Sequence, residues 1–262
     1  MKEFFGFGGG YSREPEGFLS WQHLAFVTAL MVVMVLLAVI IGVKNRKKDI
    51  AQRYRVLLVA AILIDSFEIF KIVTMCFRAG DALLWRYELP LFLCSIQLIA
   101  IPLAALSRGR IKQAALDFVL IFGILGAILG TYCAGNNYGS YPVLCFDNVI
   151  SGITHSIAGF TSLYIAISGI ASMKKRNAPI TVAILLGFCT CAAIANALID
   201  YNYMFLIRGD GTPYEILYSL VGGNSVLYPL GVILLFIIYM AAFYSVFYLV
   251  RAIRVKKAQT NN

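Results

Sequence analysis

The chain has 262 residues, of which 60% are hydrophobic and only 13% are charged, and its formal net charge is +9. Soluble domains carry roughly 25% charged residues, so this composition excludes a soluble enzyme, a disordered chain and a disulfide-rich secreted scaffold. The basic residues stand in short runs beside apolar stretches and form no basic stripe interleaved with aromatics. This distribution argues against a nucleic-acid partner and indicates membrane topology as the origin of the charge.

Seven apolar segments follow one another, each long enough to cross a hydrocarbon core of about 30 Å. They cover residues 21–43, 55–77, 89–106, 114–134, 149–173, 179–199 and 226–250. We therefore expect an all-α membrane protein with seven transmembrane helices. The expected organisation is an N-terminal segment over residues 1–20, a seven-helix domain over 21–250 and a basic tail over 251–262.

Basic residues mark one side of the membrane. Sixteen of the 22 Lys and Arg residues lie at one set of segment ends, in the runs 44–55, 108–112, 174–176 and 251–257. The opposite ends hold only Lys2, Arg13, Arg78, Arg86 and Arg208. Because basic residues accumulate on the cytoplasmic side, we expect the N-terminus outside, the C-terminus in the cytoplasm and a multi-pass protein of the cell membrane. The first 20 residues do not resemble a cleaved signal peptide.

The fourth segment and the cysteines have mainly structural interpretations. Gly123, Gly126, Ala127 and Gly130 are small residues at nearly four-residue spacing, which predicts a closely packed helix. Among the six cysteines, two lie on the outer side, where a disulfide can persist, and their pairing stays open. These two are Cys133 and Cys145. The pair Cys189 and Cys191 points in different directions on a helix, so we expect buried thiols, no metal site and no cofactor.

The second segment contains three ionisable residues, Asp65, Glu68 and Lys71. Each such group costs roughly 2.5–3.5 kcal/mol on membrane-insertion scales, which makes it a candidate functional residue. Their i, i+3 spacing places Glu68 within reach of both Asp65 and Lys71. Two interpretations remain open: a buried polar network that locks helices together, or a group that faces a substrate.

Cys94 is the thiol best suited to chemistry. Pro90 precedes it, and because Pro favours the first turn of a helix, we expect the third helix to begin near Pro90. Cys94 would then lie near a helix N-terminus, whose partial positive charge favours a thiolate. Gln97, one turn further on, could donate a hydrogen bond on the same face. The alternative, a small buried residue, stays open.

The two histidines differ in depth. His23 lies near the outer end of the first segment, where a satisfied structural hydrogen bond is the favoured interpretation. His155 lies deeper in the fifth segment, and both a structural and a chemical role stay open. At 1.5 Å per residue, Cys94 is about 7 Å from its outer helix end, His155 and Lys71 about 9 Å, and Glu68 about 13 Å. A thiol and an imidazole in one layer, with a carboxylate and a cation nearby, can support covalent acyl transfer.

The chain resembles the bacterial YwaF-like family of seven-span integral membrane proteins over most of its length. The matching pieces are Phe18–His23 (FLSWQH), Glu68, Leu89–Cys94 (LPLFLC), His155 and Asn202–Met204 (NYM). That family is similar to an animal membrane acyltransferase that moves acyl chains into ether lysophospholipids during plasmalogen remodelling with a cysteine and a histidine. It is more distantly similar to the androgen-induced hydrolases of fatty acid esters of hydroxy fatty acids, which use Thr and His.

The resemblance implies Cys94 as nucleophile, His155 as base and Glu68 as an orienting group. It marks His23 and Asn202 as motif positions, which we place with the candidate substrate-binding residues. Many members of the family read LPLHLC, whereas Phe92 takes the place of that histidine here. This difference removes a candidate base and weakens a metal-site interpretation.

Three functions follow from these observations. The leading one is a lipid acyltransferase or transacylase open to the outer leaflet, with a phospholipid or lysophospholipid as partner and Lys71 or Arg86 holding the phosphate. Hydrolysis is the same chemistry with water as acceptor. The alternative is an ion- or proton-coupled transporter that uses Asp65, Glu68 and Lys71 as a relay. A noncatalytic assembly factor is the third possibility.

Overall fold

The computed structural model describes residues 1–171 and 173–260. Ser172, Asn261 and Asn262 lie outside the described residues, as do the side chains of Arg254 and Lys257 from the predicted basic tail. The described residues form helices and connecting loops, without strands. The all-α prediction is therefore confirmed. The chain divides into two compact units, Met1–Ser172 and Met173–Asn262, which we describe separately.

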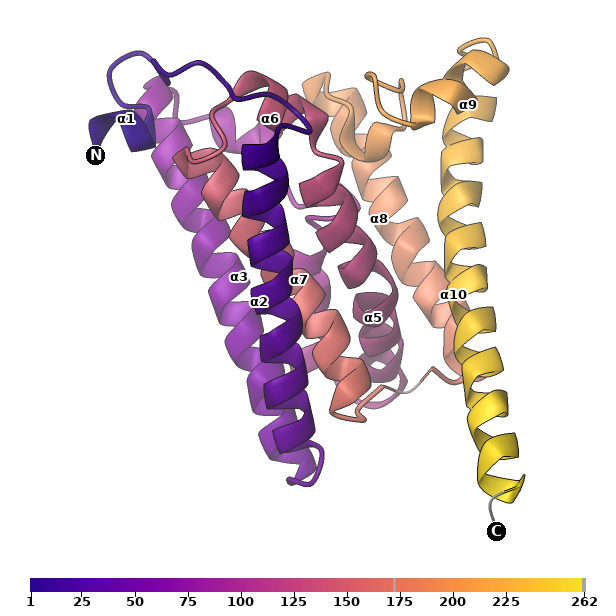
Figure 1. The fold of residues 1–262 in the computed structure, drawn as a ribbon. Coiled ribbons are helices and arrows are strands. Elements are labelled where there is room, and N and C mark those ends of the chain that lie inside the picture. Colours follow the sequence, from indigo (N-terminus) through magenta and orange to yellow (C-terminus); the bar gives the residue numbers. More distant parts are fainter. Residues whose placement is uncertain (172, 261–262) are drawn as a thin grey trace. The chain divides into compact units, whose positions relative to one another are not determined.

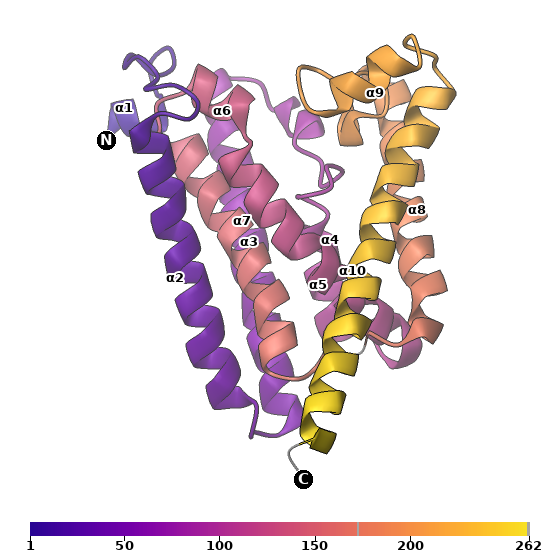
Figure 2. The ribbon, with the colours of Figure 1, turned by 45° about the vertical axis from the view of Figure 1, so that its right-hand side comes forward.

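The first unit is a bundle of long helices that run side by side (Figures 1 and 2). Its elements are α1 (Lys2–Phe5), α2 (Trp21–Asn45), α3 (Ile50–Ala79), the 3₁₀ turn η1 (Leu84–Tyr87), α4 (Gln97–Leu106), α5 (Gly109–Tyr132), α6 (Gly135–Ser140) and α7 (Phe146–Ile167). The helix α7 packs against α2, α3 and α5, and α4 packs against α3 and α5. This arrangement places α3, α4 and α7 next to one another.

Local sequence signals set several helix ends. Ser20 caps α2, because its hydroxyl accepts the backbone N–H of His23. Gly80 ends α3 in a left-handed conformation, with a φ of 66°. The helix α7 ends at Ile167, six residues before the predicted end of the fifth segment, and the left-handed Gly169 follows it. That conformation suits glycine and stops the helix.

The central helix α5 confirms the predicted packing of small residues. A Cβ atom added at Gly123 would lie 2.8 Å from the carbonyl oxygen of Ala158 on α7, closer than real Cβ contacts allow. Ala127 is completely buried and contacts Met31 and Met34 of α2. The glycines of α5 therefore let neighbouring helices approach its backbone directly.

The third apolar segment is not one continuous helix. The helix α4 begins at Gln97, not near Pro90 as expected. The residues before it form a turn in which Ser95 Oγ donates to the Phe92 carbonyl oxygen and accepts the Phe92 N–H. A serine side chain that bonds to nearby backbone competes with the helical hydrogen bonds. Cys94 consequently lies in the turn that leads into α4 instead of inside the helix.

Five helices in the described part of the chain are long and apolar enough to cross a membrane. They are α2, α5, α7 and, from the second unit, α8 and α10. The helix α3 has 30 residues but carries charged side chains in its middle, and α4 has only ten residues. Length and composition therefore support a multi-pass membrane protein with five evident spans.

The second unit contains two long helices joined by a folded loop. Its elements are the 3₁₀ turn η2 (Lys175–Asn177), α8 (Ala178–Ile199), the 3₁₀ turn η3 (Tyr203–Phe205), α9 (Tyr214–Leu220) and α10 (Leu227–Thr260). Asn196 holds the start of the loop on α8, since its side chain accepts the Tyr203 N–H and donates to the Tyr203 carbonyl oxygen.

The N-terminal segment folds back onto the ends of α3 and α7. Arg78 donates to the carbonyl oxygen of Phe5 and to the hydroxyl of Tyr11, and it forms a 2.7 Å ion pair with Asp147. Burial would raise the pKa of Glu16, but the Val143 N–H that it accepts at 2.7 Å helps to hold its pKa below the usual value. The segment thus forms a strap over this end of the bundle.

Cys133 and Cys145, whose pairing was open, are both free thiols.

Candidate functional site

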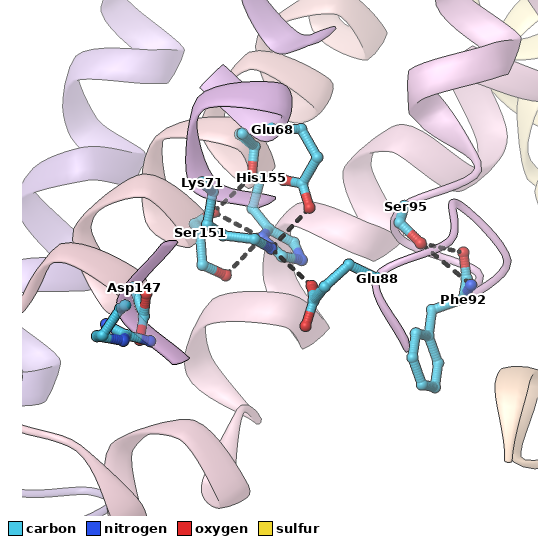
Figure 3. A network of polar contacts seen from close by, with 10 residues as sticks. Glu68, Lys71, Glu88, Phe92, Ser95, Asp147, Ser151 and His155 are labelled. Carbon is cyan, nitrogen blue, oxygen red and sulfur yellow. Dashed lines mark hydrogen bonds and ion pairs between the residues drawn. The ribbon is translucent and has the colours of Figure 1, made fainter. Parts of the chain in front are cut away.

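Several polar residues gather where α3, α7 and the turn before α4 meet. Figure 3 shows Glu68, Lys71, Glu88, Ser151 and His155 close together. Glu68 and Lys71 come from α3, His155 from α7, and Glu88 from the segment that follows η1. The first unit alone therefore assembles the cluster.

Lys71 forms ion pairs with two carboxylates. Its Nζ lies 2.6 Å from Glu68 Oε1 and 3.1 Å from Glu88 Oε2. The Lys71 side chain is 14% exposed and that of Glu68 is 11% exposed. Two carboxylates and one ammonium leave one excess negative charge, and the Asp65 carboxylate interacts electrostatically with Glu68 as well. This charge balance disfavours phosphate binding at Lys71, so the structure does not support the expected phosphate contact.

Hydrogen bonding fixes the tautomer of His155. Its Nδ1 lies 2.7 Å from the carbonyl oxygen of Ser151, one turn earlier on α7. A carbonyl oxygen can only accept, so Nδ1 carries the proton and Nε2 presents its lone pair. The Nε2 atom is buried and lacks a partner with standard hydrogen-bond geometry. His155 also interacts electrostatically with Glu68.

The Cys94 thiol is the group that faces this imidazole. The two side chains lie within reach of a side-chain hydrogen bond and interact electrostatically, although their contact is looser than a standard hydrogen bond. Catalytic hydrogen bonds are often loose before substrate binds. The backbone N–H groups of Cys94 and Ser95 lie near the same sulfur, and such donors stabilise a thiolate. The structure thus brings Cys94, His155 and Glu68 together.

Two glycines of α5 provide the surface against which the pair packs. A Cβ atom at Gly126 would lie 3.2 Å from Cys94 Cα, and one at Gly130 would overlap His155 Nε2. Gly126 and Gly130 are four residues apart, so they lie one above the other on the same face of α5. A side chain at Gly130 would therefore displace the imidazole, and one at Gly126 would require a small shift at Cys94.

Gln97 begins α4 directly after the Cys94 turn and is completely buried. Its backbone N–H donates to the Cys94 carbonyl oxygen in an i to i+3 bond, a geometry in which the two side chains stand nearly in line. Neither Oε1 nor Nε2 of Gln97 has a hydrogen-bond partner in the described residues. A buried amide without partners costs roughly 1–3 kcal/mol per unsatisfied group and is suited to a polar ligand.

Two residues expected to bind substrate use their side chains in local structure. His23 is completely buried, and it uses both ring nitrogens: Nδ1 accepts the Leu19 N–H and Nε2 donates to the Thr131 carbonyl oxygen. Asn202 lies in the second unit, where its side chain donates to Arg208 and Asp210 and accepts the Ile207 N–H. Both side chains are therefore fully engaged in holding local structure.

Arg86, the remaining candidate phosphate ligand, lies in η1, two residues before Glu88. Its guanidinium carbon is 4.9 Å from the centre of the Tyr87 ring. Residues 92–95, which contain Cys94, are all partly exposed. The turn that contains Cys94 is therefore accessible at its surface and is not sealed within the packed core.

Sequence reasoning missed three contributors to the site. Glu88 lies just before the apolar third segment, so it did not stand out in the sequence as a charged residue inside a span, and its pairing with Lys71 could not be predicted. Ser151 acts through its backbone carbonyl, which no residue pattern reveals. Gly130 was visible as part of a small-residue stripe, but that stripe indicated helix packing and not a seat for an imidazole. Within the described residues, no group of three or more His, Cys, Asp or Glu could hold a metal ion.

Comparison with known proteins gave one match. A family model described as the TMEM164 family matches residues 18–244. This range contains every residue of the cluster described above. No curated protein and no solved structure matched the chain.

Proposed function

Because the chain belongs to the TMEM164 family of membrane proteins, we propose that it is a membrane-embedded lipid acyltransferase or transacylase with Cys94 as its nucleophile. The proposal depends on one observation: the Nδ1–H of His155 donates to the Ser151 carbonyl oxygen, which leaves the Nε2 lone pair for the Cys94 thiol. The resemblance to YwaF-like proteins and to the plasmalogen-remodelling acyltransferase gives the same roles to these two residues.

The proposed topology has seven spans in the cell membrane. The helix α3 and the segment 89–106, which contains α4, join the five evident spans, with the N-terminus outside and the C-terminus in the cytoplasm. An unwound stretch at membrane depth is tolerated where it is enclosed by protein or lines a cavity. The turn around Cys94 packs against Gly126 of α5, which is consistent with this requirement. The reacting groups then lie in the outer half of the bilayer.

The first half of the reaction forms an acyl-enzyme. His155 Nε2 accepts the Cys94 proton, and the thiolate attacks the ester carbonyl of a phospholipid donor. The tetrahedral intermediate collapses to a thioester on Cys94, and the departing lysophospholipid alkoxide takes the proton from Nε2. In the second half, the hydroxyl of an acceptor lysophospholipid gives its proton to Nε2 and attacks the thioester. The new ester leaves, and Cys94 regains the proton. Water as acceptor would give hydrolysis instead.

The surrounding groups have distinct parts in this scheme. The excess negative charge of the group formed by Glu68, Lys71 and Glu88 stabilises the imidazolium that forms in each half-reaction. Gln97 Nε2 donates to the carbonyl oxygen as it becomes an oxyanion, and the burial of this amide strengthens the interaction. Arg86, near the outer end of the cluster, binds the lipid phosphate.

The experiment follows labelled acyl groups in vesicles that contain the purified protein. A phospholipid labelled in its acyl chain is the donor, and an unlabelled lysophospholipid is the acceptor. We expect wild-type protein to transfer the label and Cys94→Ala to fall to the level of empty vesicles. Cys76→Ala is the matched control, because Cys76 is also a free and partly exposed thiol. A thioester that hydroxylamine cleaves should accumulate on wild type when the acceptor is omitted.

The same preparation separates the transporter alternative. If Cys94→Ala retained wild-type transfer, the acyl-enzyme would be wrong. A protein in which Glu68→Gln abolished a proton or ion flux while Cys94→Ala left that flux intact would be a carrier. Loss of neither activity in either variant would indicate an assembly factor.

A further inference from the structure

A second, separate lipid contact is indicated by an apolar groove between α2, α3 and α7. The groove has a volume of about 510 Å³, and its lining is apolar except for Arg55 and Ser156. On α7 it is lined by Ile153, Ser156, Ile157 and Phe160. These positions form a stripe at i, i+3, i+4 and i+7. His155 lies two residues from both Ile153 and Ile157, so it points to the other side of the helix. The groove is therefore distinct from the Cys94 site.

The length of the groove corresponds to one leaflet. Its lining on α2 extends from Leu30 to Ile41, which is about 16 Å at 1.5 Å per residue. This is about half of a 30 Å hydrocarbon core. A transmembrane helix from a partner would need a surface across the whole core, whereas an acyl chain occupies one leaflet only. The dimensions consequently favour a lipid chain over a helix.

A single cation stands at one end of the groove. Arg55 is exposed, and no ion pair or hydrogen bond to it occurs within residues 1–171. The neighbouring Arg53, by contrast, donates to the carbonyl oxygens of Lys48 and Ser168 and so ties helix ends together. Arg55 lies at the start of α3, beside the basic connection from α2. A guanidinium at that end of an apolar groove complements an anionic phosphate above an acyl chain.

We propose that this groove binds an anionic phospholipid from the leaflet on the side of the α2–α3 connection, with one acyl chain along α2 and α7 and the phosphate at Arg55. A neutral lipid would fill the same apolar walls but gain less from the cation. Basic residues near a membrane surface attract anionic lipids with about 1 kcal/mol each, which corresponds to about fivefold in affinity. The site does not depend on chemistry at Cys94.

The test compares lipid retention on the purified full-length protein by native mass spectrometry. Phosphatidylglycerol is the anionic probe and phosphatidylcholine the zwitterionic one. We expect Arg55→Gln to weaken phosphatidylglycerol retention about fivefold, with a smaller effect on phosphatidylcholine. Arg46→Gln is the matched control, because Arg46 is also exposed at this end of the bundle but does not line the groove. Val59→Trp, at a half-exposed position of the lining, should obstruct the groove and lower retention of both lipids.

Each other result overturns the proposal. Equal phosphatidylglycerol retention by wild type, Arg55→Gln and Val59→Trp would show that the groove does not hold this lipid. A loss with Val59→Trp but none with Arg55→Gln would show an acyl groove without recognition of the head group. A change of oligomeric state in Val59→Trp, with lipid retention intact, would identify a second copy of the chain as the occupant. Acyl transfer by Arg55→Gln would be measured in parallel, because the Cys94 reaction should persist whichever result is found.

Discussion

The two histidines of this chain show how one residue type supports two different tasks. His23 joins α2 to α5, with Nδ1 accepting the Leu19 N–H and Nε2 donating to the Thr131 carbonyl oxygen. His155 has the opposite tautomer, with Nδ1 donating to Ser151 and the Nε2 lone pair turned towards a thiol. Burial is common to both regions. The difference that matters is whether the second nitrogen already has a backbone partner.

Replacing each histidine by alanine should separate these tasks most strongly. His155→Ala should lower acyl transfer by about 10²–10⁴-fold, the usual contribution of a general base, while most protein remains folded. His23→Ala leaves the Thr131 carbonyl oxygen and the Leu19 N–H without their partner, at roughly 1–3 kcal/mol for each buried group. It should lower the unfolding temperature but preserve transfer per folded molecule. Transfer rates and thermal unfolding of both variants measure the difference. Equal loss of activity at constant folded fraction would contradict it.

A substitution on α5 should disturb His155 without touching its chemistry. Gly130→Ala places a methyl group where His155 Nε2 lies, so the imidazole must move. A displacement of about 1 Å at a reacting group can lower a rate by about 10²-fold. Gly187→Ala on α8 is the matched control, because a Cβ there meets no atom within 4 Å. Its helix should gain up to about 1 kcal/mol in stability, with unchanged transfer.

Retained activity in Gly130→Ala would mean that the imidazole position is not critical. A crystal or cryo-electron microscopy structure of that variant would then locate the ring. His23 provides the contrast for this variant. Backbone groups bond to both of its ring nitrogens, so its tautomer does not depend on the glycines of α5.

The smallest expected effect concerns pH and the N-terminal strap. The pKa of Glu16 is lowered in the folded protein, chiefly by the Val143 N–H acting against burial. A lowered folded pKa means that this stabilisation is complete above the unfolded pKa and is lost as the pH falls through the folded value. For a contact near the surface it amounts to less than about 1 kcal/mol. The protection factor of the Val143 N–H, which is its exchange rate relative to the unstructured rate at the same pH, should therefore fall below about pH 4 in wild type, and Glu16→Gln should remove this pH dependence.

The fold was largely readable from the sequence, and the reasons for the exceptions are local. The helices α2, α8 and α10 begin within a few residues of the predicted segments, since continuous apolar runs decide their positions. The start of α4 was wrong because Ser95 closes a turn that competes with helical bonds, which hydropathy does not register. Glu88 and Ser151 stayed hidden because their roles depend on tertiary neighbours. Glu68 was visible because an ionisable group within an apolar segment is costly, whereas Cys94 was chosen for its expected place near a helix start and His155 for its depth.

The turn before α4 has a further consequence. In a continuous helix, main-chain N–H groups donate to carbonyl oxygens one turn earlier. An interruption of the helix leaves some of these N–H groups able to donate to another group, and no dedicated side chain is needed. Mutating individual residues in this stretch cannot delete those donors, except by introducing proline. These donors would be lost if the turn became helical. Substitutions around Pro90 and Ser95 that promote a helix should therefore disturb the environment of the Cys94 sulfur more than substitutions that change polarity. Natural variation there should accordingly be freer in side-chain size than in helix-forming tendency.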